Sequence, residues 1–450
     1  MRKKSNVLNP VTMSLASVVI FIHIANGQER KLNIEEAVNL ALHQNHAVKI
    51  AHYRLEADRQ KLRGARSTYY PRVTNESTFF HISDLQRVEV PAGSLGSIPG
   101  GVNLPTSNVF LPQGKETLET SGTEIAQPLT QLIKIHDANK IAAADVGISA
   151  ASLQATSTEV VFSVHELYYR ILTTQLQRKA AEAQISASDE VLAENAEQLK
   201  NGSLLQAALL ESRAKALAAK QALLTADMQI SDLTTQLNDV LGLPLDTKLV
   251  LDPVIDVGAE VPTREMALQT ALKNSPEVQQ AITELSKARA AQGAAKAEYI
   301  PDITGFARYS YQNGVSFVDH NFGTFGIQFN FDLFDGGKRE SLVRERNEET
   351  SEAQENIERV KEEVVVQIAK VYDRLATTRS MVDVAKGSLA AFEENSRLVE
   401  DQFRQGKLLP SSVDASRAQT LDAEAGVLTA QLEYLLAQDE LTRILGRTGP

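Results

Sequence analysis

The chain lacks cysteine altogether, although it has 450 residues. An exported protein without cysteine has no disulfide framework, and it offers no thiol to carry a lipid at the N-terminus of the mature chain. Long apolar runs are also absent, because no segment after residue 27 has 18 or more consecutive apolar residues. We therefore expect no transmembrane helix.

Motifs of catalysis are absent as well. His43, His46 and His52 lie near helical spacing, but no acids or cysteines cluster with them, so we expect surface histidines rather than a metal site. The pair His165-Glu166 lacks the second histidine of a zinc-protease motif. No phosphate-binding loop or nucleophile elbow is present. The sequence thus predicts neither an enzyme nor a bound cofactor or metal.

Residues 1–27 are typical of a secretory signal peptide. Arg2 to Lys4 form a basic start, Val11 to Ile24 form an apolar stretch too short and interrupted to span a bilayer, and Ala25-Asn26-Gly27 offers a cleavage site. An anchor helix is the alternative interpretation. Removal of this segment changes the net charge from −11 to −14, because three basic residues and no acids are lost. Nucleic-acid binding needs a basic face, so this charge argues against it.

Most of the remaining chain consists of two copies of one unit. Residues 36–73 and 266–303 match at a constant offset of 230, and further on the offset falls to 204. The first copy therefore carries 26 extra residues, which lie between Pro71 and Leu129. Such self-similarity indicates a repeat architecture. The predicted division is a first repeat at 28–243, a linker at 244–262 and a second repeat at 263–450.

Each copy has the same predicted order of elements: short helix, helix, strand, loop, strand, very long helix, turn and return helix. The first copy has helices near 34–43 and 46–68, strands near 72–82 and 117–128, and helices near 131–200 and 204–241. The second copy has helices near 263–273 and 277–298, strands near 302–312 and 322–334, and helices near 338–405 and 409–445. Pro253 and Gly258 break any helix in the linker.

The predicted long helices are unusual in length. Residues 131–200 contain no proline and one glycine, and about 70 residues at 1.5 Å each extend roughly 105 Å. A heptad line runs from Val164 to Leu199, and its image in the second copy runs from Ile368 to Phe403. A heptad seam requires a partner helix. We expect that partner to be the return helix, where three leucines share the spacing: Leu210, Leu217 and Leu224.

The second copy also contains a clearly alternating strand. Apolar residues occupy every second position from Phe325 to Leu333, with polar residues or glycine between them. This pattern fits a strand that faces lipid outside and water inside, and it fits a half-buried soluble strand equally well. Four strands cannot close a barrel, and an open edge cannot lie in lipid. If the strands cross a membrane, three chains would supply twelve strands for one barrel and twelve helix segments for a tube.

The duplicated motifs together resemble the TolC-type outer-membrane efflux proteins over residues 30–447. The motifs are Tyr-x-Pro-like junctions at 69–71 and 299–301, Leu-Phe-Asp-Gly-Gly-Lys at 333–338, turn glycines followed by Ser-Arg-Ala at 212–214 and 416–418, and Leu-Gly at 241–242 and 445–446. The resemblance implies a mainly α fold with a small β part. Long α-helical hairpins would form a periplasmic tunnel, and four strands per chain would contribute to a twelve-stranded β-barrel shared by a homotrimer in outer-membrane lipid. The implied partners are a periplasmic adaptor protein and an inner-membrane pump.

The same resemblance assigns roles to the junctions and turns. Asp335, Gly336 and Gly337 would form a flexible strand-to-helix junction, with Asp335 as a helix cap. Pro71 and Pro301 would stop the incoming helices before the strands. Gly202 and Gly406 would reverse the long helices at the periplasmic tip, where an adaptor binds, and plain hairpin packing is the alternative. The apolar tip contacts would be Leu204, Leu205, Leu408 and Leu409.

The family aperture is often closed by acids just after the tip glycine, so Asp414 and Glu211 are the candidate aperture acids. Solvated charges on a helix face are the alternative for both residues. The proline- and glycine-rich stretch 84–114 reads as a variable loop facing the exterior, or else as a receptor, plug or lid. The predicted function is a passive exit duct for small molecules. Protein export of type I and a periplasmic coiled-coil scaffold remain the alternatives.

Overall fold

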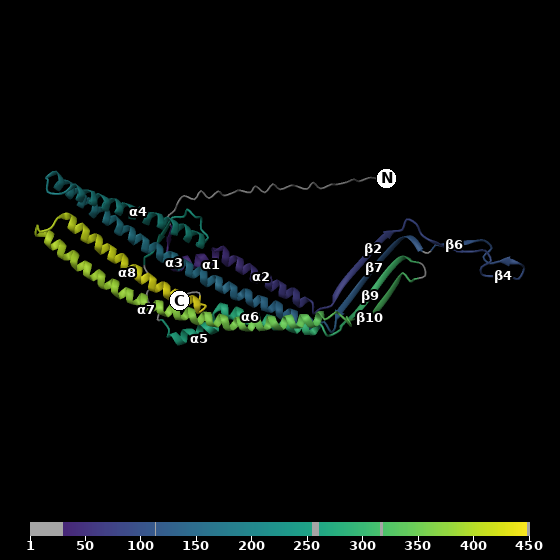
Figure 1. Ribbon diagram of the computed structural model, residues 1–450. Helices are drawn as coiled ribbons and strands as arrows, with labels where there is room; N and C mark the ends of the chain where they lie inside the picture. The colour runs from purple at the N-terminus through teal and green to yellow at the C-terminus, as the bar shows by residue number, and fades with distance from the viewer. Residues whose placement is uncertain (1–29, 113, 254–260, 316–317, 448–450) are drawn as a thin grey trace, which may run out of the picture.

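The computed structural model describes residues 30–112, 114–253, 261–315 and 318–447. The predicted signal peptide and part of the predicted linker lie outside these ranges. The chain forms a long helical part and a separate antiparallel sheet, joined end to end (Figure 1). In the described residues, none of the helices is apolar over a stretch long enough to cross a membrane.

Eight helices of the described chain follow the predicted duplicate order within a few residues at each end. In the first copy they are α1 (Ile34–Gln44), α2 (His46–Ser67), α3 (Leu132–Lys200) and α4 (Gln206–Leu241). In the second copy they are α5 (Arg264–Asn274), α6 (Pro276–Ala297), α7 (Lys338–Arg404) and α8 (Pro410–Ile444). Each copy thus pairs a short helix and a medium helix with one very long hairpin.

A tyrosine at equivalent positions of the two copies ties each long helix to the chain segment beside it. Tyr168 is 1% exposed, and its hydroxyl lies 3.0 Å from the carbonyl of Leu32 and 2.8 Å from that of Asp252. Burial raises the pKa of this hydroxyl to about 12, so it stays protonated as a donor. In the second copy, the Tyr372 hydroxyl donates to the carbonyl of Pro262 at 2.6 Å.

Four strands form the main sheet in the order β10-β9-β7-β2, all antiparallel. Their bounds are β2 (Arg72–His81), β7 (Gly114–Pro128), β9 (Asp302–Val315) and β10 (Asn321–Asn330). The two copies meet where β7 pairs with β9, so β2 and β10 are left as the two edges. The prediction that the last strand continues to residue 334 was wrong, because β10 ends at Asn330, before the turn into α7.

Shorter strands occupy two regions that were predicted to be a linker and a loop. In the linker, β8 (Leu249–Leu251) pairs in parallel with β1 (Arg30–Leu32). In the loop, β3 (Arg87–Val90) pairs with β6 (Val109–Pro112), and β4 (Ser97–Ile98) pairs with β5 (Val102–Asn103). The segment from β3 to β6 extends beyond the far end of the main sheet (Figure 1). The sequence analysis did not predict β3 and β6, because prolines and glycines surround their alternating apolar residues: Val88, Val90, Val109 and Leu111.

The expected leucine seam of α4 was wrong. Leu210, Leu217 and Leu224 are 55%, 59% and 69% exposed, so they do not face α3. The buried residues of α4 follow the same heptad period on the opposite side and are mostly small: Ser212, Ala216, Ala219, Ala226, Leu233 and Leu237. Because alanine is small, the alanine side of α4 can pack closely against α3. The leucines lie on the opposite side of α4 and therefore point away from α3.

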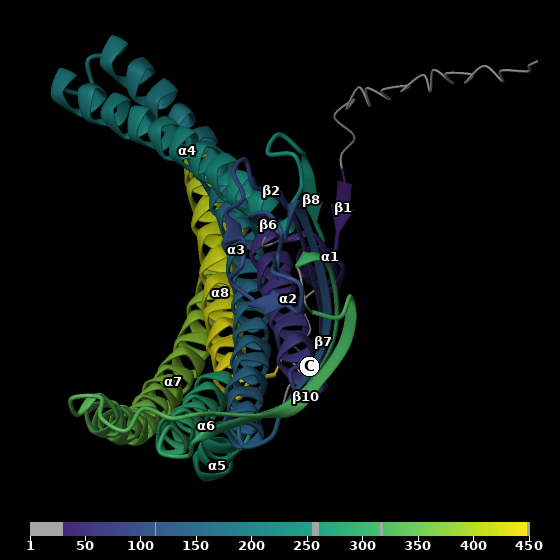
Figure 2. The same ribbon diagram turned by 90° about the vertical axis from the view of Figure 1, so that its right-hand side faces the viewer.

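The helices form a curved layer (Figure 2). Toward the tip, α3 contacts both α4 and α8, and α8 contacts α7, so the order across the layer is α4, α3, α8, α7. Toward the sheet, the order is α2, α3, α6, α7. In Figure 2, α4 and α7 lie at the two ends of an arc, and α1 and β1 lie on its convex side.

Candidate functional site

The junction between β10 and α7 is built around Asp335. Its carboxylate accepts hydrogen bonds from the backbone N–H of Gly337 at 3.0 Å and of Arg339 at 3.1 Å, and from the Arg339 side chain at 2.6 Å. Gly336 and Gly337 have φ of 67° and 87°, which other residues rarely adopt. The Arg339 guanidinium also lies 4.9 Å from the centre of the Phe331 ring. The side chain of Asp335 therefore does satisfy an N–H of the first helical turn, from a position two residues before the cap residue Gly337.

The Arg339 guanidinium that hydrogen-bonds to Asp335 holds the pKa of this carboxyl below its usual range. A lowered pKa in the folded state means that the ionised carboxylate stabilises the junction above about pH 4, and that this stabilisation is lost as the pH falls through the lowered pKa. We expect Asp335→Asn to lower the thermal midpoint by a few degrees at pH 7, and the difference from the wild type to vanish toward pH 2. Helix circular dichroism in detergent measures it. Asp332→Asn is the control, and an equal difference at both pH values would contradict the assignment.

The equivalent junction of the first copy uses a threonine instead of an aspartate. The Thr130 hydroxyl donates to the carbonyl of Pro301 at 2.6 Å and accepts from the backbone N–H of Ile303 at 2.8 Å. Pro301 directly precedes β9, and Pro71 directly precedes β2, as predicted. Thr130 therefore fixes the start of α3 against the junction of the other copy. Thr130 thus joins the strand-to-helix transition from β7 to α3 with the helix-to-strand transition from α6 to β9.

The turn at the far end of each hairpin is closed by a glycine in the left-handed region. Gly202 has φ of 74° and Gly406 has φ of 71°. In each turn the residue after the glycine donates its N–H five residues back, from Ser203 to Gln198 and from Lys407 to Gln402. The two turns lie at the same end of the molecule (Figure 1). We call this end the tip, and its role as the periplasmic tip that binds an adaptor stays a prediction.

The paired leucines after each tip glycine have different exposures. Leu204 and Leu408 are half-buried against their hairpins, whereas Leu205 is 79% exposed and Leu409 is 52% exposed. Two large apolar side chains thus point outward at the tip of one chain. Their role as contacts for another molecule stays a prediction.

One polar contact joins the two hairpins close to the tip. The Glu194 carboxylate on α3 accepts a hydrogen bond from the Ser411 hydroxyl at 2.6 Å and from the Ser411 backbone N–H at 3.3 Å. Ser411 lies in the first turn of α8 and is buried. A carboxylate at this position satisfies an N–H that has no partner within its own helix. The start of α8 in the second copy is thus capped by a residue of the first copy.

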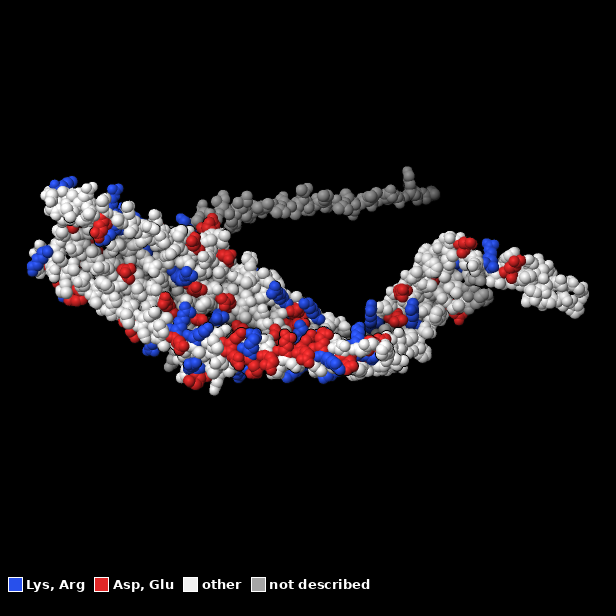
Figure 3. Space-filling view, in the orientation of Figure 1, with Lys and Arg blue, Asp and Glu red and all other residues white. Residues whose placement is uncertain are grey.

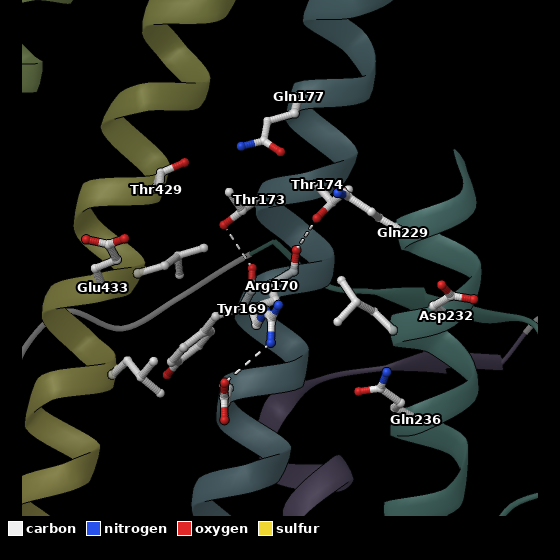
Figure 4. Close-up of a pocket in the computed structure, with 14 residues that line it drawn as sticks. Tyr169, Arg170, Thr173, Thr174, Gln177, Gln229, Asp232, Gln236, Thr429 and Glu433 are labelled. Carbon is white, nitrogen blue, oxygen red and sulfur yellow. Dashed lines mark hydrogen bonds and ion pairs between the residues drawn. The ribbon is translucent and has the colours of Figure 1, made fainter. Parts of the chain in front are cut away.

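The face of the layer opposite β1 and β8 contains a groove with many polar side chains. Tyr168 points toward those strands, so residues half a turn away on α3 lie on the other side of the helix. There a groove of about 430 Å³ lies over α3 between α4 and α8 (Figure 4). Its labelled side chains are mostly hydroxyls, amides and acids: Thr173, Thr174, Gln177, Gln229, Asp232, Gln236, Thr429 and Glu433. Leucines of α4 and α8 also line this groove, so its surface combines polar side chains with apolar ones.

The sequence profile described as outer membrane efflux protein matches residues 37–243 and 267–447, which is most of the chain. The chain belongs to the outer membrane efflux protein family. It is thus an outer-membrane efflux channel that extends into the periplasm, of the kind that works in tripartite efflux systems, and the family is not one of enzymes.

Several solved channels share this fold. The efflux channel is 14% identical to the Campylobacter jejuni CmeC outer membrane channel, with a TM-score of 0.74 over 92% of this chain and 85% of that one. It is 15% identical to CusC, with a TM-score of 0.70 over 92% of each chain. It is 14% identical to the outer membrane protein VceC of Vibrio cholerae, with a TM-score of 0.70 over 92% of this chain and 96% of that one. Among curated protein sequences, none matches the channel.

The two candidate aperture acids lie on different helices of the efflux channel and do not meet within one chain. Glu211 lies on α4 and forms an ion pair with Lys215 at 2.8 Å, which lowers the pKa of the Glu211 carboxyl. Asp414 lies on α8 and is half-buried. The helices α4 and α8 flank α3 on opposite sides, so the two acids lie apart within the described chain. Their role at an aperture stays a prediction.

Three polar residues of the junction and tip were missed by sequence reasoning: Thr130, Glu194 and Ser411. None of them belongs to a recognisable motif, and their partners lie far away in sequence. The signal that existed was positional, because Thr130 stands where the other copy has Asp335-Gly336-Gly337. In the described ranges, no group of histidines and acids is arranged to hold a metal ion.

Proposed function

We propose that three copies of this chain form a continuous duct, with the strands in one shared twelve-stranded barrel and the helices in one tube. The observation that carries the proposal is the pair of open edges. Among the described residues, both β2 and β10 lack a partner strand on their outer side, and strand edges with free N–H and C=O groups are not tolerated in lipid. Pairing of β10 with β2 of the next copy closes the sheet.

The outward faces of the edge strands support a place for this sheet in lipid. Phe325, Ile327 and Phe329 on β10 are 86%, 71% and 64% exposed, and they share one face. A soluble sheet would bury such a row against a second layer, whereas a membrane barrel presents it to the acyl chains. Tyr309 on the neighbouring strand is also exposed and donates its hydroxyl to Asn321 at 3.0 Å.

The duct is passive, and the energy for transport comes from an inner-membrane pump linked through a periplasmic adaptor. The exposed Leu205 and Leu409 offer apolar contacts for that adaptor at the tip. The hydroxyl, amide and carboxylate side chains of the groove over α3 suit small solutes that pass with their water. The channel opens when the hairpins separate at the tip, where the Glu194–Ser411 contact holds them together.

Single-channel recording tests this function directly. Detergent-purified protein in a planar bilayer should give discrete conductance steps, and native mass spectrometry of the same sample should give the mass of three chains. A water-soluble monomer or dimer without conductance would overturn the duct and would favour a periplasmic coiled-coil scaffold. A trimer that conducts ions, combined with export of a polypeptide in cells, would retain the duct and reassign the cargo to type I secretion.

A further inference from the structure

The segment from β3 to β6, residues 87–112, forms a ribbon of its own, which we call the arm. Between the pairs β3–β6 and β4–β5, the backbone N–H of Leu95 donates to the carbonyl of Leu104 at 2.9 Å, and the N–H of Leu104 donates to the carbonyl of Gly96 at 2.8 Å. The Asn108 amide donates to the Glu89 carboxylate at 2.6 Å. The arm has the length of the 26 residues by which the first copy exceeds the second. It is therefore an ordered addition to one copy of the repeat.

One face of the arm next to the main sheet is apolar and uncovered. Val88 is paired with Leu111, and the next pair on the same face is Val90 with Val109. Val88, Val109 and Leu111 are 45%, 37% and 47% exposed. The two charged residues of β3 lie on the opposite face. The ribbon is thus amphipathic, and its apolar face has no cover within the described chain.

The outer part of the arm carries no charge. Residues 90–114 contain no Lys, Arg, His, Asp or Glu. Figure 3 shows the end of the arm without the blue and red side chains that cover the helical part. Further large apolar residues are exposed there, including Leu95 at 76% and Phe110 at 56%. A soluble surface rarely gathers so many exposed apolar residues, so we expect another molecule to cover them.

Neither water nor lipid suits the apolar face. A two-stranded ribbon by itself is at best marginally stable in water. Among the described residues, β3 and β6 form a sheet of two strands, so both edges of the ribbon lack a partner strand. Open strand edges do not occur in the hydrocarbon of a membrane. The cover must therefore be a protein surface that is apolar and free of charge.

We propose that the arms of three copies pack together through this apolar face and form a cap over the mouth of the barrel, at the end away from the helices. The inference rests on the proposed trimer and adds a contact outside the barrel and the tube. Each arm follows β2, the edge strand that pairs with the next copy, so the three arms arise from one ring. Three equal charges near a three-fold axis would repel one another, and the lack of charge in residues 90–114 removes that repulsion.

The arm is long enough to reach its neighbours. Twelve strands spaced about 4.8 Å apart and tilted by about 40° enclose a barrel with a radius of about 12 Å. From Arg87 to Val90 the arm advances about 10 Å. Val90 and its paired residue Val109 therefore come close to the axis, and the charged face of the ribbon turns toward water. The remainder of each arm lies along the other two.

Disulfide trapping tests the contact, and the absence of native cysteine removes any background. We expect full-length Val109→Cys to form a covalent dimer on oxidation in membranes, which dithiothreitol reverses on a denaturing gel. A single cysteine in each chain can join two of three copies, so part of the protein stays monomeric. The matched control is Phe110→Cys, because Phe110 is the next residue on the same strand but lies on the opposite face. It should stay monomeric.

Labelling of intact cells tests whether the arms cover the mouth. Thr324 lies on the face of β10 opposite to Phe325, so in the barrel it faces the lumen. A sulfonated fluorescent maleimide, which does not cross the membrane, should label Thr324→Cys slowly from outside. Deletion of residues 87–112 should abolish this protection. Asp84→Cys is the control, because Asp84 is exposed, precedes the arm and remains in the deletion variant. It should react at the same rate with and without the arm.

The outcomes separate the cap from the duct. A conducting trimer in which Val109→Cys forms no dimer, or no more dimer than Phe110→Cys, overturns the cap and leaves the duct standing. Equal labelling of Thr324→Cys with and without the arm also overturns the cap. Loss of trimer and conductance in the wild type overturns the duct and the cap together. A bond from Val109→Cys to a different protein would assign the apolar face to that protein and overturn the contact between arms.

Discussion

Gly446→Ala is expected to destabilise the folded chain by about 2–4 kcal/mol, as the sum of backbone strain and a steric clash. Gly446 follows α8 with φ of 71°, a conformation that residues with a side chain rarely adopt. An added Cβ would lie 2.6 Å from the carbonyl oxygen of Asn274, at the end of α5. A carbonyl of the main chain cannot move aside as a flexible side chain can. The chain would have to shift where α5, α6 and α8 meet.

The first copy contains an equivalent glycine in equally close contact, so the same substitution can be tested twice in one chain. Gly242 follows α4 with φ of 69°, and its added Cβ would lie 2.9 Å from the carbonyl oxygen of Gln44. Gly242→Ala should therefore cost a comparable amount. Gly202 is the matched control, because its φ is 74° but an added Cβ would meet nothing within 4 Å. Gly202→Ala should cost only about 1 kcal/mol.

The midpoint of thermal unfolding in detergent measures all three glycine variants. The expected order is a large and similar loss for Gly446→Ala and Gly242→Ala, and a small loss for Gly202→Ala. Equal losses at all three positions would show that backbone conformation alone matters. In that case the close approach of the return helices to α1 and α5 would contribute little to stability.

Glu194→Ala is expected to raise the open probability of the reconstituted channel. The lost hydrogen bonds involve a charged carboxylate, and such bonds contribute about 1.5–3 kcal/mol each in a protein. Removal of about 1.5 kcal/mol from the closed arrangement shifts the ratio of open to closed tips by roughly tenfold. Ser411→Ala removes the shorter of the two bonds, so it should act in the same direction with a smaller effect.

Glu190→Ala is the control for this variant, because Glu190 is an exposed acid on the same helix, one turn nearer the middle of α3. It changes the charge of the tip by the same amount and removes no contact between the hairpins. Open probability from single-channel traces is the measurement. If Glu190→Ala opens the channel as much as Glu194→Ala does, then surface charge rather than the contact with Ser411 controls the tip.

The order and bounds of the elements could be predicted because local signals and the repeat agreed. Pro71 and Pro301 mark helix ends, and Gly202 and Gly406 mark the hairpin turns. Because the chain is duplicated, the bounds predicted in one copy could be compared with those predicted in the other. The long helices were the easiest elements, since a run without proline and with a clear period has few alternatives. The small β part followed from the alternation near Phe325.

The side of a helix that faces a given partner could not be predicted in the same way. A heptad period on α4 exists on two opposite sides, one with alanines and one with Leu210, Leu217 and Leu224. The sequence favoured the leucines as the residues that contact α3, but in the structure the alanine side packs against α3 because small side chains allow the two helices to lie closer together. Side-chain size alone did not reveal that the leucines remain exposed in the folded chain. The contact of Glu194 with Ser411 could not be predicted from the sequence either, because 217 positions separate the two residues.

The length of α3 has a mechanical consequence. From its start at Leu132 to Glu194 the helix rises about 93 Å, without a proline to bend it. A stiff rod of that length converts angle into distance, so a relative tilt of only about one degree at the sheet end displaces the Glu194 carboxylate by about 1.6 Å. Such a displacement exceeds what a hydrogen bond of 2.6 Å can follow. A rotation too small to disturb strand pairing at one end is thus amplified into a broken contact at the other.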